Sequence, residues 1–324
     1  MTPAAIVVVF KKWTGYVAEC VRAIENLRGG PYPLVLVPDG PVPEYVGSAR
    51  VVVHAGSIAQ KRNAGVGACP PEVPWVAFVD SDAWPRTDWM LGFQTRLDKL
   101  SSSLPVVCVT GPDLTPPLDP WTRRVTGYAL ASPLIMGRGS LRFRVSEKAV
   151  FVRNASTCNM FVRRDALSSV GGFDERLLTS EDVQLCQDLL SRGGAILFDP
   201  EIAVFHHRRD IPRFFLQWFN EGLALRHYRR FPAAGNFLQH LPSVLMLSEA
   251  ALLFLGWTGL GLVMCLELGQ YVVFYFDSLR RGTGAFLSHG VAFSMWLFVK
   301  AYGAGGMISY LFRPRKYVHS RCDH

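Results

Sequence analysis

Short runs of apolar residues alternate with segments of helical periodicity along the first 236 residues of the chain. The apolar runs have the length and composition of buried strands, and in the segments between them apolar residues recur at every third or fourth position, as on one face of a helix. Strand and helix therefore alternate, which predicts an α/β domain with a doubly wound, mostly parallel sheet. The strands are predicted at 4–10, 33–40, 49–56 and 75–82, and the helices at 16–27 and 58–69.

Further elements are predicted beyond these, with one irregular interval. A helix at 88–100 and a strand at 105–111 lead into a proline-rich loop and then a basic stretch without clear periodicity, which continues to Arg153. A strand, a helix, a glycine-rich turn and a second helix, which opens near Glu181, follow. One last strand is predicted over 195–207, and it ends in two histidines.

The composition changes at residue 237, beyond which the chain is apolar and carries few charges until residue 312. Three apolar segments there approach the roughly 20 residues that a bilayer crossing needs. We predict two to three transmembrane segments in residues 237–324, followed by a basic tail. Residues 212–236 mix aromatic residues with arginines, which is typical of a helix in the membrane interface, although an ordinary amphipathic surface helix has the same pattern.

Charged residues constrain how these apolar segments are arranged. Arginine clusters at 278–281 and 313–316 flank the last segment, and the positive-inside rule predicts that both lie in the cytoplasm. Three full crossings would separate the clusters, so one segment is expected to be re-entrant or interfacial. Glu249 and Glu267 are costly in lipid and are expected to face protein or head groups. The chain is thus predicted to be a multi-pass or hairpin-anchored protein of the cell membrane.

The net charge and the cysteines narrow the class of partner. A net charge of +8 and a pI near 9.2 suit nucleic acid, anionic lipid or a phosphorylated substrate. No nucleic-acid-binding motif accompanies the charge, and many arginines adjoin the apolar segments, so we expect membrane lipids and phosphates and no nucleic acid. The seven cysteines are scattered without a C-x-x-C pair, which indicates a reducing setting rather than a disulfide scaffold or zinc knuckle.

Two of the predicted strands end in acidic residues. Asp80 and Asp82 are separated by one serine, and Asp39 ends another apolar run. Like charges this close are costly unless a cation or a proton lies between them. Because ligands of doubly wound sheets bind beyond the carboxyl ends of the strands, the acids are expected to share one sheet edge and to hold a divalent metal. The alternative is a turn that caps the helix near Trp89.

Five short motifs occur in a specific order and spacing. They are VPDG, KRNAG, FVDSDAWP, CNMFVRRDALSSVGGFDERLLTSEDVQL and PEIAVFHH. Over roughly residues 5–210 the chain resembles the family 2 glycosyltransferases, and it looks like their membrane-attached bacterial or archaeal members. The resemblance implies a GT-A fold, which is doubly wound, mostly parallel and Rossmann-like, for residues 1–211. The interfacial helix and the C-terminal transmembrane helices follow it.

The resemblance implies that these motifs bind a nucleotide-diphosphate sugar and a Mn²⁺ or Mg²⁺ ion. Asp39 would accept a hydrogen bond from the nucleobase, and Asp80 would lie on the ribose side. Asp82 would be the main metal ligand, joined by Asp80 and by His206, and the metal would neutralise the departing diphosphate. The alternatives are a solvated helix face for Arg62 and a metal-free packing position for His206. The residues that match a segment beside the nucleotide are Lys61, Arg62 and Asn63.

Glu181 and Asp182 match the acidic pair that the family uses in catalysis, and Asp182 is the predicted general base. In an inverting transfer, a carboxylate on the face opposite the leaving group takes the proton of the acceptor hydroxyl as that hydroxyl attacks C1. The alternative role of the pair is to complement the helix dipole. His207, Arg208 and Arg209 are predicted to hold a phosphate of the donor or of a lipid acceptor, or only to anchor the chain to lipid.

Departures from the family pattern narrow the expected reaction. The loop after the first strand, FKKWTG, is shorter and more basic than in relatives, and the helix around Gln217 lacks the Q-x-x-R-W motif of processive synthases. We expect a hexosyltransferase that moves one sugar from a UDP-, GDP- or dTDP-linked donor to a lipid-linked or membrane-presented glycan, with its catalytic domain in the cytoplasm. The alternatives are a polyprenyl-phosphate glycosyltransferase and an inactive nucleotide-sugar-binding membrane scaffold.

Overall fold

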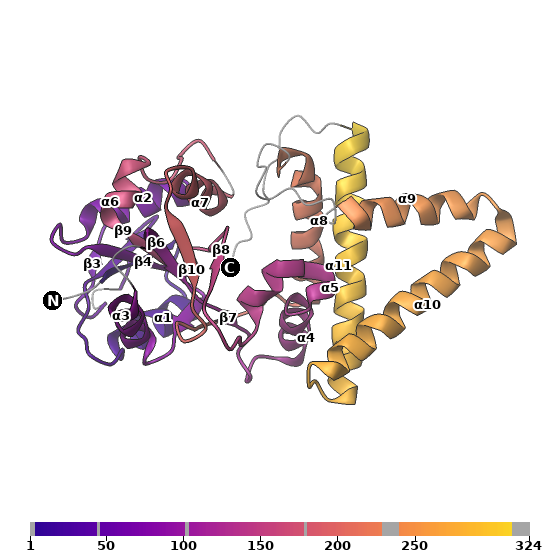
Figure 1. Ribbon diagram of the computed structural model, residues 1–324, viewed down its shortest axis with the longest axis horizontal. Helices are drawn as coiled ribbons and strands as arrows, with labels where there is room; N and C mark the ends of the chain where they lie inside the picture. The colour runs from indigo at the N-terminus through magenta and orange to yellow at the C-terminus, as the bar shows by residue number, and fades with distance from the viewer. Residues whose placement is uncertain (1–3, 44–45, 101–103, 178–179, 229–239, 313–324) are drawn as a thin grey trace. The chain divides into compact units, whose positions relative to one another are not determined.

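The computed structural model of the chain describes residues 4–43, 46–100, 104–177, 180–228 and 240–312. The chain divides into two compact units (Figure 1). The sheet unit consists of Met1–Leu114 and Arg144–His207, and the helical unit consists of Thr115–Phe143 and Arg208–His324. The helical unit therefore includes a segment, Thr115–Phe143, that was expected inside the first domain.

An eight-stranded sheet forms the centre of the sheet unit, in the order β3-β2-β1-β4-β9-β6-β10-β8. Strands β1 to β4 pair in parallel, as do β6 and β10, whereas β9 is antiparallel to β4 and β6 and β8 is antiparallel to β10. The expected α/β architecture with a mostly parallel sheet is confirmed. The strands are β1 (Ala4–Phe10), β2 (Leu34–Pro38), β3 (Arg50–Val51), β4 (Trp75–Val79), β6 (Val106–Thr110), β8 (Val150–Val152), β9 (Asn159–Arg163) and β10 (Ala195–Phe198).

Helices cover both faces of this sheet, because successive side chains of a buried strand point to opposite sides. Ile6 and Val8 of β1 belong to the core that α1 and α3 complete, and Val7 belongs to the core completed by α2, α6 and α7. Both faces of β1 are buried, which explains its uninterrupted apolar sequence. The helices are α1 (Gly15–Glu25), α2 (Ile58–Ala68), α3 (Trp89–Lys99), α6 (Arg164–Ser169) and α7 (Glu181–Ser191).

A second, three-stranded sheet lies where several strands of the first sheet end. It contains β5 (Ala83–Pro85), β11 (Val204–His206) and β7 (Asp113–Leu114), in that order. The single strand expected over 195–207 is wrong, because β10 and β11 are separate strands in different sheets. Asp199 lies between them; it is buried, pairs with Arg96, and accepts a hydrogen bond from the Glu201 amide at 3.0 Å. These polar contacts form the turn that divides the two strands.

Helix α11 (Ala285–Phe312) is the centre of the helical unit, and α4, α8, α9 and α10 pack against it (Figure 1). Glycines allow α8 and α11 to approach closely. A Cβ added to Gly222 would lie 2.2 Å from the carbonyl oxygen of Tyr302, and one added to Gly305 would lie 2.1 Å from that of Phe219. The other helices are α4 (Trp121–Leu130), α5 (Pro133–Met136), α8 (Ile211–Tyr228), α9 (Leu241–Leu253) and α10 (Gly256–Arg280), and Gly137–Phe143 forms a 3₁₀ helix.

One expectation for the helical unit is corrected, and the number of candidate spans lies at the lower end of the expected two to three. The basic stretch after the proline-rich loop is not irregular, because α4 buries Val125, Ala129 and Leu130 on one face. Of the three apolar segments, only α10 and α11 are long and apolar enough to cross a membrane among the described residues, and α9 has only 13 residues. Within the most apolar 18 residues of each helix, 11% is buried in α10 and 56% in α11. Protein therefore covers much more of α11 than of α10.

Three predicted features fall partly or wholly outside the described residues. They are the end of the interfacial helix at 229–236, the arginine cluster at 313–316 and the rest of the basic tail.

Candidate active site

The second sheet brings acidic side chains around His206. The Nε2 atom of His206 lies 3.3 Å from Asp82 Oδ1, and its Nδ1 atom lies 3.8 Å from Asp113 Oδ2. The geometry follows from strand pairing, because β11 pairs with β5 just after Asp82 and with β7, which begins at Asp113. Asp113 is buried, whereas the side chains of Asp82 and His206 remain about one-fifth exposed (21% and 18%). Solvent therefore reaches this cluster at Asp82, the predicted main metal ligand.

Burial and acidic neighbours shift the pKa values of two groups in the cluster. Burial lowers the pKa of His206, but its acidic neighbours Cys158, Asp82 and Asp113 outweigh the effect, so the pKa lies well above the ordinary value. The carboxylates of Asp82 and Asp113 beside the ring favour a positive charge there, and a divalent cation supplies such a charge at paired acids. Burial also raises the pKa of the Cys158 thiol to about 11. This thiol is therefore neutral near neutral pH.

The residues of the cluster suit a hard divalent cation. Asp80, Cys158 and His206 offer ligand atoms that all lie within 4.8 Å of one another. The 3.3 Å between His206 Nε2 and Asp82 Oδ1 is close to the spacing of about 3 Å between neighbouring ligands of an octahedral ion with bonds of about 2.1 Å. Carboxylate oxygen and imidazole nitrogen suit Mn²⁺ and Mg²⁺ better than a thiol does. Asp82, His206 and Asp80 are thus the better candidate ligands, with Cys158 as their buried neighbour.

A buried arginine connects two of the predicted motifs. Arg62 forms an ion pair with Glu181, and its other guanidinium nitrogen lies 3.5 Å from Asp80 Oδ1. The guanidinium also lies over the Phe173 ring, 5.5 Å from its centroid. Arg62 is 5% exposed, so the solvated helix face considered for it is excluded. The acid pair at the start of α7 and the acids after β4 are therefore tied together through one side chain.

Lys61 and Asn63, which flank Arg62 on α2, secure two further segments. Lys61 Nζ donates hydrogen bonds to Asp39 Oδ1 at 2.8 Å and to the carbonyl oxygen of Phe10 at 3.1 Å, so it joins the carboxyl ends of β1 and β2. Asn63 donates to the carbonyl oxygen of Phe173 and accepts from the amide of the same residue, both at 2.9 Å. Consecutive residues of α2 therefore contact the predicted nucleobase-binding acid and the segment before α7.

The two acids at the start of α7 have different surroundings. Glu181 is buried and held by Arg62, whereas Asp182 is partly exposed and accepts a hydrogen bond from the Val183 amide at 2.8 Å. Ser180 precedes them in the left-handed backbone region with φ of 63°. A residue other than glycine in that region costs roughly 1–3 kcal/mol, and such strain concentrates at functional sites.

His206, the last residue of β11, and His207, which follows it, have different partners. The His207 ring packs at a tilt against Tyr16 and Trp84, with ring centroids 4.7 Å from each, and its Nε2 atom lies 3.0 Å from Glu19 Oε2. His206, by contrast, faces Asp82 and the buried acid of β7. Of the two histidines, His206 is therefore the one placed to reach a metal.

Arg208 and Arg209, predicted to hold phosphate, belong to the helical unit. Arg208 is buried, donates through Nε to Thr115 Oγ1 at 3.2 Å and lies over the Phe143 ring at 5.0 Å. The carbonyl oxygen of Arg209 accepts a hydrogen bond from Thr126 Oγ1 at 2.7 Å. These contacts anchor the chain in the helical unit and leave the phosphate-binding role a prediction.

Sequence reasoning missed several residues of the cluster. Asp113 follows the predicted strand at 105–111, so the strand-end rule that found Asp39 could also have found it. Cys158 and Asn159 carry no comparable signal. Asn159 is buried, accepts from Trp89 Nε1 at 2.9 Å and donates to the carbonyl oxygens of Pro112 and Ile202, and thereby fixes the loops that lead into β7 and β11.

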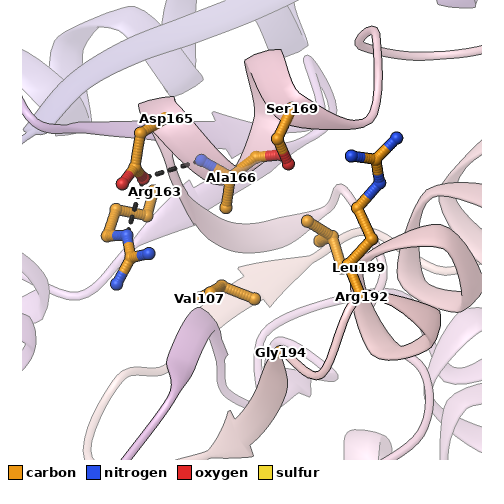
Figure 2. Close-up of a pocket in the computed structure, with 8 residues that line it drawn as sticks. All are labelled: Val107, Arg163, Asp165, Ala166, Ser169, Leu189, Arg192 and Gly194. Carbon is orange, nitrogen blue, oxygen red and sulfur yellow. Dashed lines mark hydrogen bonds and ion pairs between the residues drawn. The ribbon is translucent and has the colours of Figure 1, made fainter.

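A separate hollow of about 170 Å³ lies on the sheet unit, away from these residues (Figure 2). Figure 2 shows the ion pair of Arg163 and Asp165 at its edge, with a distance of 2.6 Å between Nε and Oδ1. None of the predicted site residues lines it. The hollow is therefore distinct from the acidic cluster. Its lining residues are Val107, Arg163, Asp165, Ala166, Ser169, Leu189, Arg192 and Gly194.

Comparison with known proteins tests the fold expected from the sequence. No protein-family model matches the chain. In sequence, it is 29% identical over 198 residues to the pre-mycofactocin glycosyltransferase of two Mycobacterium tuberculosis strains, which covers 58% of this chain and 40% of that protein. In structure, it is similar to the mannosyltransferase PcManGT of Pyrobaculum calidifontis in complex with GDP-Man and Mn²⁺, with a TM-score of 0.58, 14% identity, and coverage of 90% of this chain and 86% of that chain. The chain has the GT-A fold.

The GT-A fold expected from the motifs is thus confirmed, and the sequence relative supports the resemblance to family 2 glycosyltransferases. The chain spans 40% of the length of the curated relatives it matches. It is also similar to Staphylococcus aureus TarS in complex with UDP-GlcNAc, at 14% identity over 68% of this chain and 66% of that chain, with a TM-score of 0.47. Within the GT-A fold, the acidic cluster lies at the carboxyl ends of the strands, where ligands of such sheets bind.

Proposed function

We propose that the chain is an inverting, metal-dependent glycosyltransferase that moves one sugar from a nucleotide-diphosphate sugar to a lipid-linked or membrane-presented glycan. The observation that carries the proposal is the contact of Arg62 with both Asp80 and Glu181. This contact unites a candidate metal and donor site with a candidate catalytic pair in one region of the sheet unit. A sugar bound at the acids after β4 would therefore lie near the start of α7.

The metal site of this proposal consists of Asp82 and His206 with Asp80 nearby. A bound Mn²⁺ or Mg²⁺ would neutralise the two phosphates of the donor and so improve the leaving group. The Asp113 carboxylate lies 3.8 Å from the second ring nitrogen of His206, and a carboxylate on that side of the ring would orient a histidine ligand and strengthen it. The complex of PcManGT with GDP-Man and Mn²⁺ supports the same pairing of nucleotide sugar and metal here.

The donor is bound along the carboxyl ends of β1, β2 and β4. The Asp39 side chain is 35% exposed while Lys61 holds one of its oxygens, so the carboxylate is both oriented and accessible. A carboxylate held in this way can accept a hydrogen bond from a nucleobase N–H. Donors linked to UDP, GDP and dTDP all offer such a group.

Asp182 is the proposed general base, and Glu181 is a positioning residue that acts through Arg62. As the acceptor oxygen forms a bond to C1 of the sugar, its proton passes to the Asp182 carboxylate. The bond between C1 and the phosphate oxygen breaks, and the nucleoside diphosphate leaves with the electron pair. Because attack and departure occur on opposite faces of C1, the configuration is inverted.

The acceptor is proposed to be presented at a membrane. The helical unit has two helices with the length and composition of membrane spans, and α10 exposes most of its apolar surface. A lipid-linked glycan would be held at the same surface as the enzyme, with the sheet unit in the cytoplasm. The sugar hydroxyl of such an acceptor must be deprotonated as it attacks, and Asp182 is the proposed base for that proton.

The test compares Asp182→Asn with Asp188→Asn, a control on the same helix, in full-length protein with Mn²⁺ and a panel of nucleotide sugars. We expect Asp182→Asn to keep donor binding, measured as a thermal shift. Its rate of sugar transfer, or of background donor hydrolysis, should fall by about 100-fold to 10,000-fold. Full activity of Asp182→Asn would refute the base assignment. A product with the sugar on a phosphate would identify a polyprenyl-phosphate glycosyltransferase, and absence of donor turnover by wild-type protein would identify a binding scaffold.

A further inference from the structure

Helices α9 and α10 form a hairpin whose tip is strongly apolar and exposed. At the tip, Phe254 is 93% exposed, Leu255 61% and Trp257 89%. Residues 250–266 contain no charged side chain, and Glu249 and Glu267 stand at the two ends of that interval. Exposed apolar surface of this extent on a hairpin marks an interaction site rather than ordinary protein surface.

The two glutamates that bound this interval meet at one lysine of α11. Lys300 Nζ lies 2.7 Å from both carboxylate oxygens of Glu249 and 2.5 Å from Glu267 Oε1. Trp296 Nε1 donates to Glu267 Oε2 at 2.5 Å. We call Lys300, Glu249 and Glu267 the hairpin clamp. It ties both arms of the hairpin to one residue of α11, and the interval between the two glutamates carries no charge. Figure 1 shows α9 and α10 extending from α11.

The shorter arm limits how far the tip can extend from α11. Of the 13 residues of α9, only those after Glu249 lie between the clamp and the tip, a length of about 8 Å at the ordinary helical rise. The part of α10 between the tip and Glu267 is longer, at about 17 Å, so it must run obliquely. The hydrocarbon core of a bilayer is about 30 Å thick. A tip held by the shorter arm therefore stays within one leaflet when the clamp lies at the membrane surface.

The second half of α10 has the composition of an interfacial helix. Tyr271 and Tyr275 contact His289 of α11, and the helix ends at Arg280, followed by Arg281. Aromatic rings gather at the level of lipid head groups, and arginines at their anionic phosphates. The clamp, the tyrosines and the arginines all belong to the base of the hairpin, whereas residues 250–266 around the tip carry no charge. The distribution of charge therefore matches one leaflet with a polar boundary on one side only.

We infer that the α9–α10 hairpin is a wedge that inserts into a single leaflet, with its tip among the acyl chains and its clamp at the head groups. The inference rests on the membrane attachment in the proposed function and specifies its form. α10 does not cross the bilayer; it enters obliquely, because its tip can go no deeper than the short α9 allows. The charged clamp stays at the surface, where the cost of burying charge in lipid is avoided.

The test uses impermeant maleimide on full-length protein in vesicles of phosphatidylcholine and phosphatidylglycerol. Cys265 and Cys322 are replaced by serine, and one cysteine is then introduced at the tip as Thr258→Cys or at the base as Gly284→Cys. A Cβ at Gly284 meets no described atom within 4 Å, so this control is structurally harmless. In one sample the reagent is added only outside the vesicles. In a second sample, freezing and thawing also loads it into the lumen, so that it reaches both sides.

We expect Gly284→Cys to react and Thr258→Cys to remain unmodified from both sides until detergent is added. Reaction of Thr258→Cys only when reagent reaches the side opposite Gly284→Cys would show a full crossing and overturn the wedge. Reaction from the same side as Gly284→Cys would show a hairpin in water and overturn it equally. Donor turnover in the same vesicles reports on the proposed function separately, since the sheet unit contains the catalytic residues.

A second measurement tests the apolar tip itself. The double variant Phe254→Glu/Trp257→Glu is expected to lose most of its sedimentation with vesicles while donor turnover in detergent is unchanged. Val145→Glu is the matched control, because Val145 is 74% exposed and lies in the sheet unit. Equal sedimentation of the tip variant and the control would contradict the wedge.

Discussion

Replacement of Arg62 by methionine removes the charge that joins two motifs of the site while it keeps much of the side-chain volume. Its partner Glu181 is 8% exposed, so the variant leaves a buried carboxylate without its counter-charge. Removal of one partner from a buried ion pair costs about 3–5 kcal/mol. Asp80 adds little to this cost because its side chain is one-third exposed and water can solvate it. We therefore place the loss at the lower end, about 3 kcal/mol.

The expected loss is large enough to measure as a change in melting temperature. For a unit of roughly 180 residues, 1 kcal/mol corresponds to about 2–4 °C. Arg62→Met should therefore melt about 6–12 °C below the wild type when tryptophan fluorescence of the full chain is followed in detergent. Glu181→Gln should recover much of that loss in the Arg62→Met background, because the uncompensated charge is then absent.

The double-mutant cycle gives the result that would refute this reasoning. We expect an interaction energy of about 2 kcal/mol between the two positions, within the range seen for residues in contact. If Arg62→Met melts with the wild type, or if Glu181→Gln destabilises the variant further, Arg62 does not balance the charge of Glu181. The proposed link between the metal motif and the catalytic pair would then lose its physical basis.

Three further predictions concern the packing and the thiols. Gly222→Ala should lower the free energy of unfolding by about 1–3 kcal/mol, because the new methyl group meets the backbone of α11. Gly261→Ala is the control and should leave the free energy of unfolding unchanged, because its methyl group meets no described atom within 4 Å. Thermal unfolding followed by circular dichroism compares the two variants. Lys300→Met should leave the two glutamates of the clamp uncompensated, cost about 3 kcal/mol and speed proteolysis within the hairpin, and an unchanged cleavage rate would contradict the clamp. Burial raises the pKa of Cys69 to about 11 and of Cys186 to about 12. Neither thiol should therefore react with iodoacetamide in the folded chain when the pH is raised from 7 to 8, and both should react once the chain is denatured. Peptide mapping of the alkylated protein checks this.

The sequence was most informative where one local rule decides the structure. β1, β2 and β4 are buried on both faces, so their apolar runs are uninterrupted and their positions could be predicted closely. Asp39 and Asp80 follow such runs directly, and the parallel arrangement of the strands then brings their ends to one edge. The fold class and the first half of the candidate site follow from these patterns.

The sequence was least informative where tertiary contacts decide the structure. The apolar residues on both sides of Asp199 read as one strand, because the pairing of Asp199 with Arg96 comes from a helix far away in sequence. Asp113 begins β7, and although it closely follows a predicted strand in the sequence, only the pairing of β7 with β11 places it beside His206. The meeting of Glu249 and Glu267 at Lys300 likewise depends on helix packing that no local periodicity reports.

Binding of Mn²⁺ is the most direct test of the acidic cluster as a metal and donor site. Loss of the free-ion electron paramagnetic resonance signal is followed as full-length protein is titrated in detergent with a nucleoside diphosphate present. The account predicts saturable binding by the wild type and by Asp188→Asn, and its loss in both Asp82→Asn and His206→Ala. Binding by Asp82→Asn as tight as that of the wild type would contradict it.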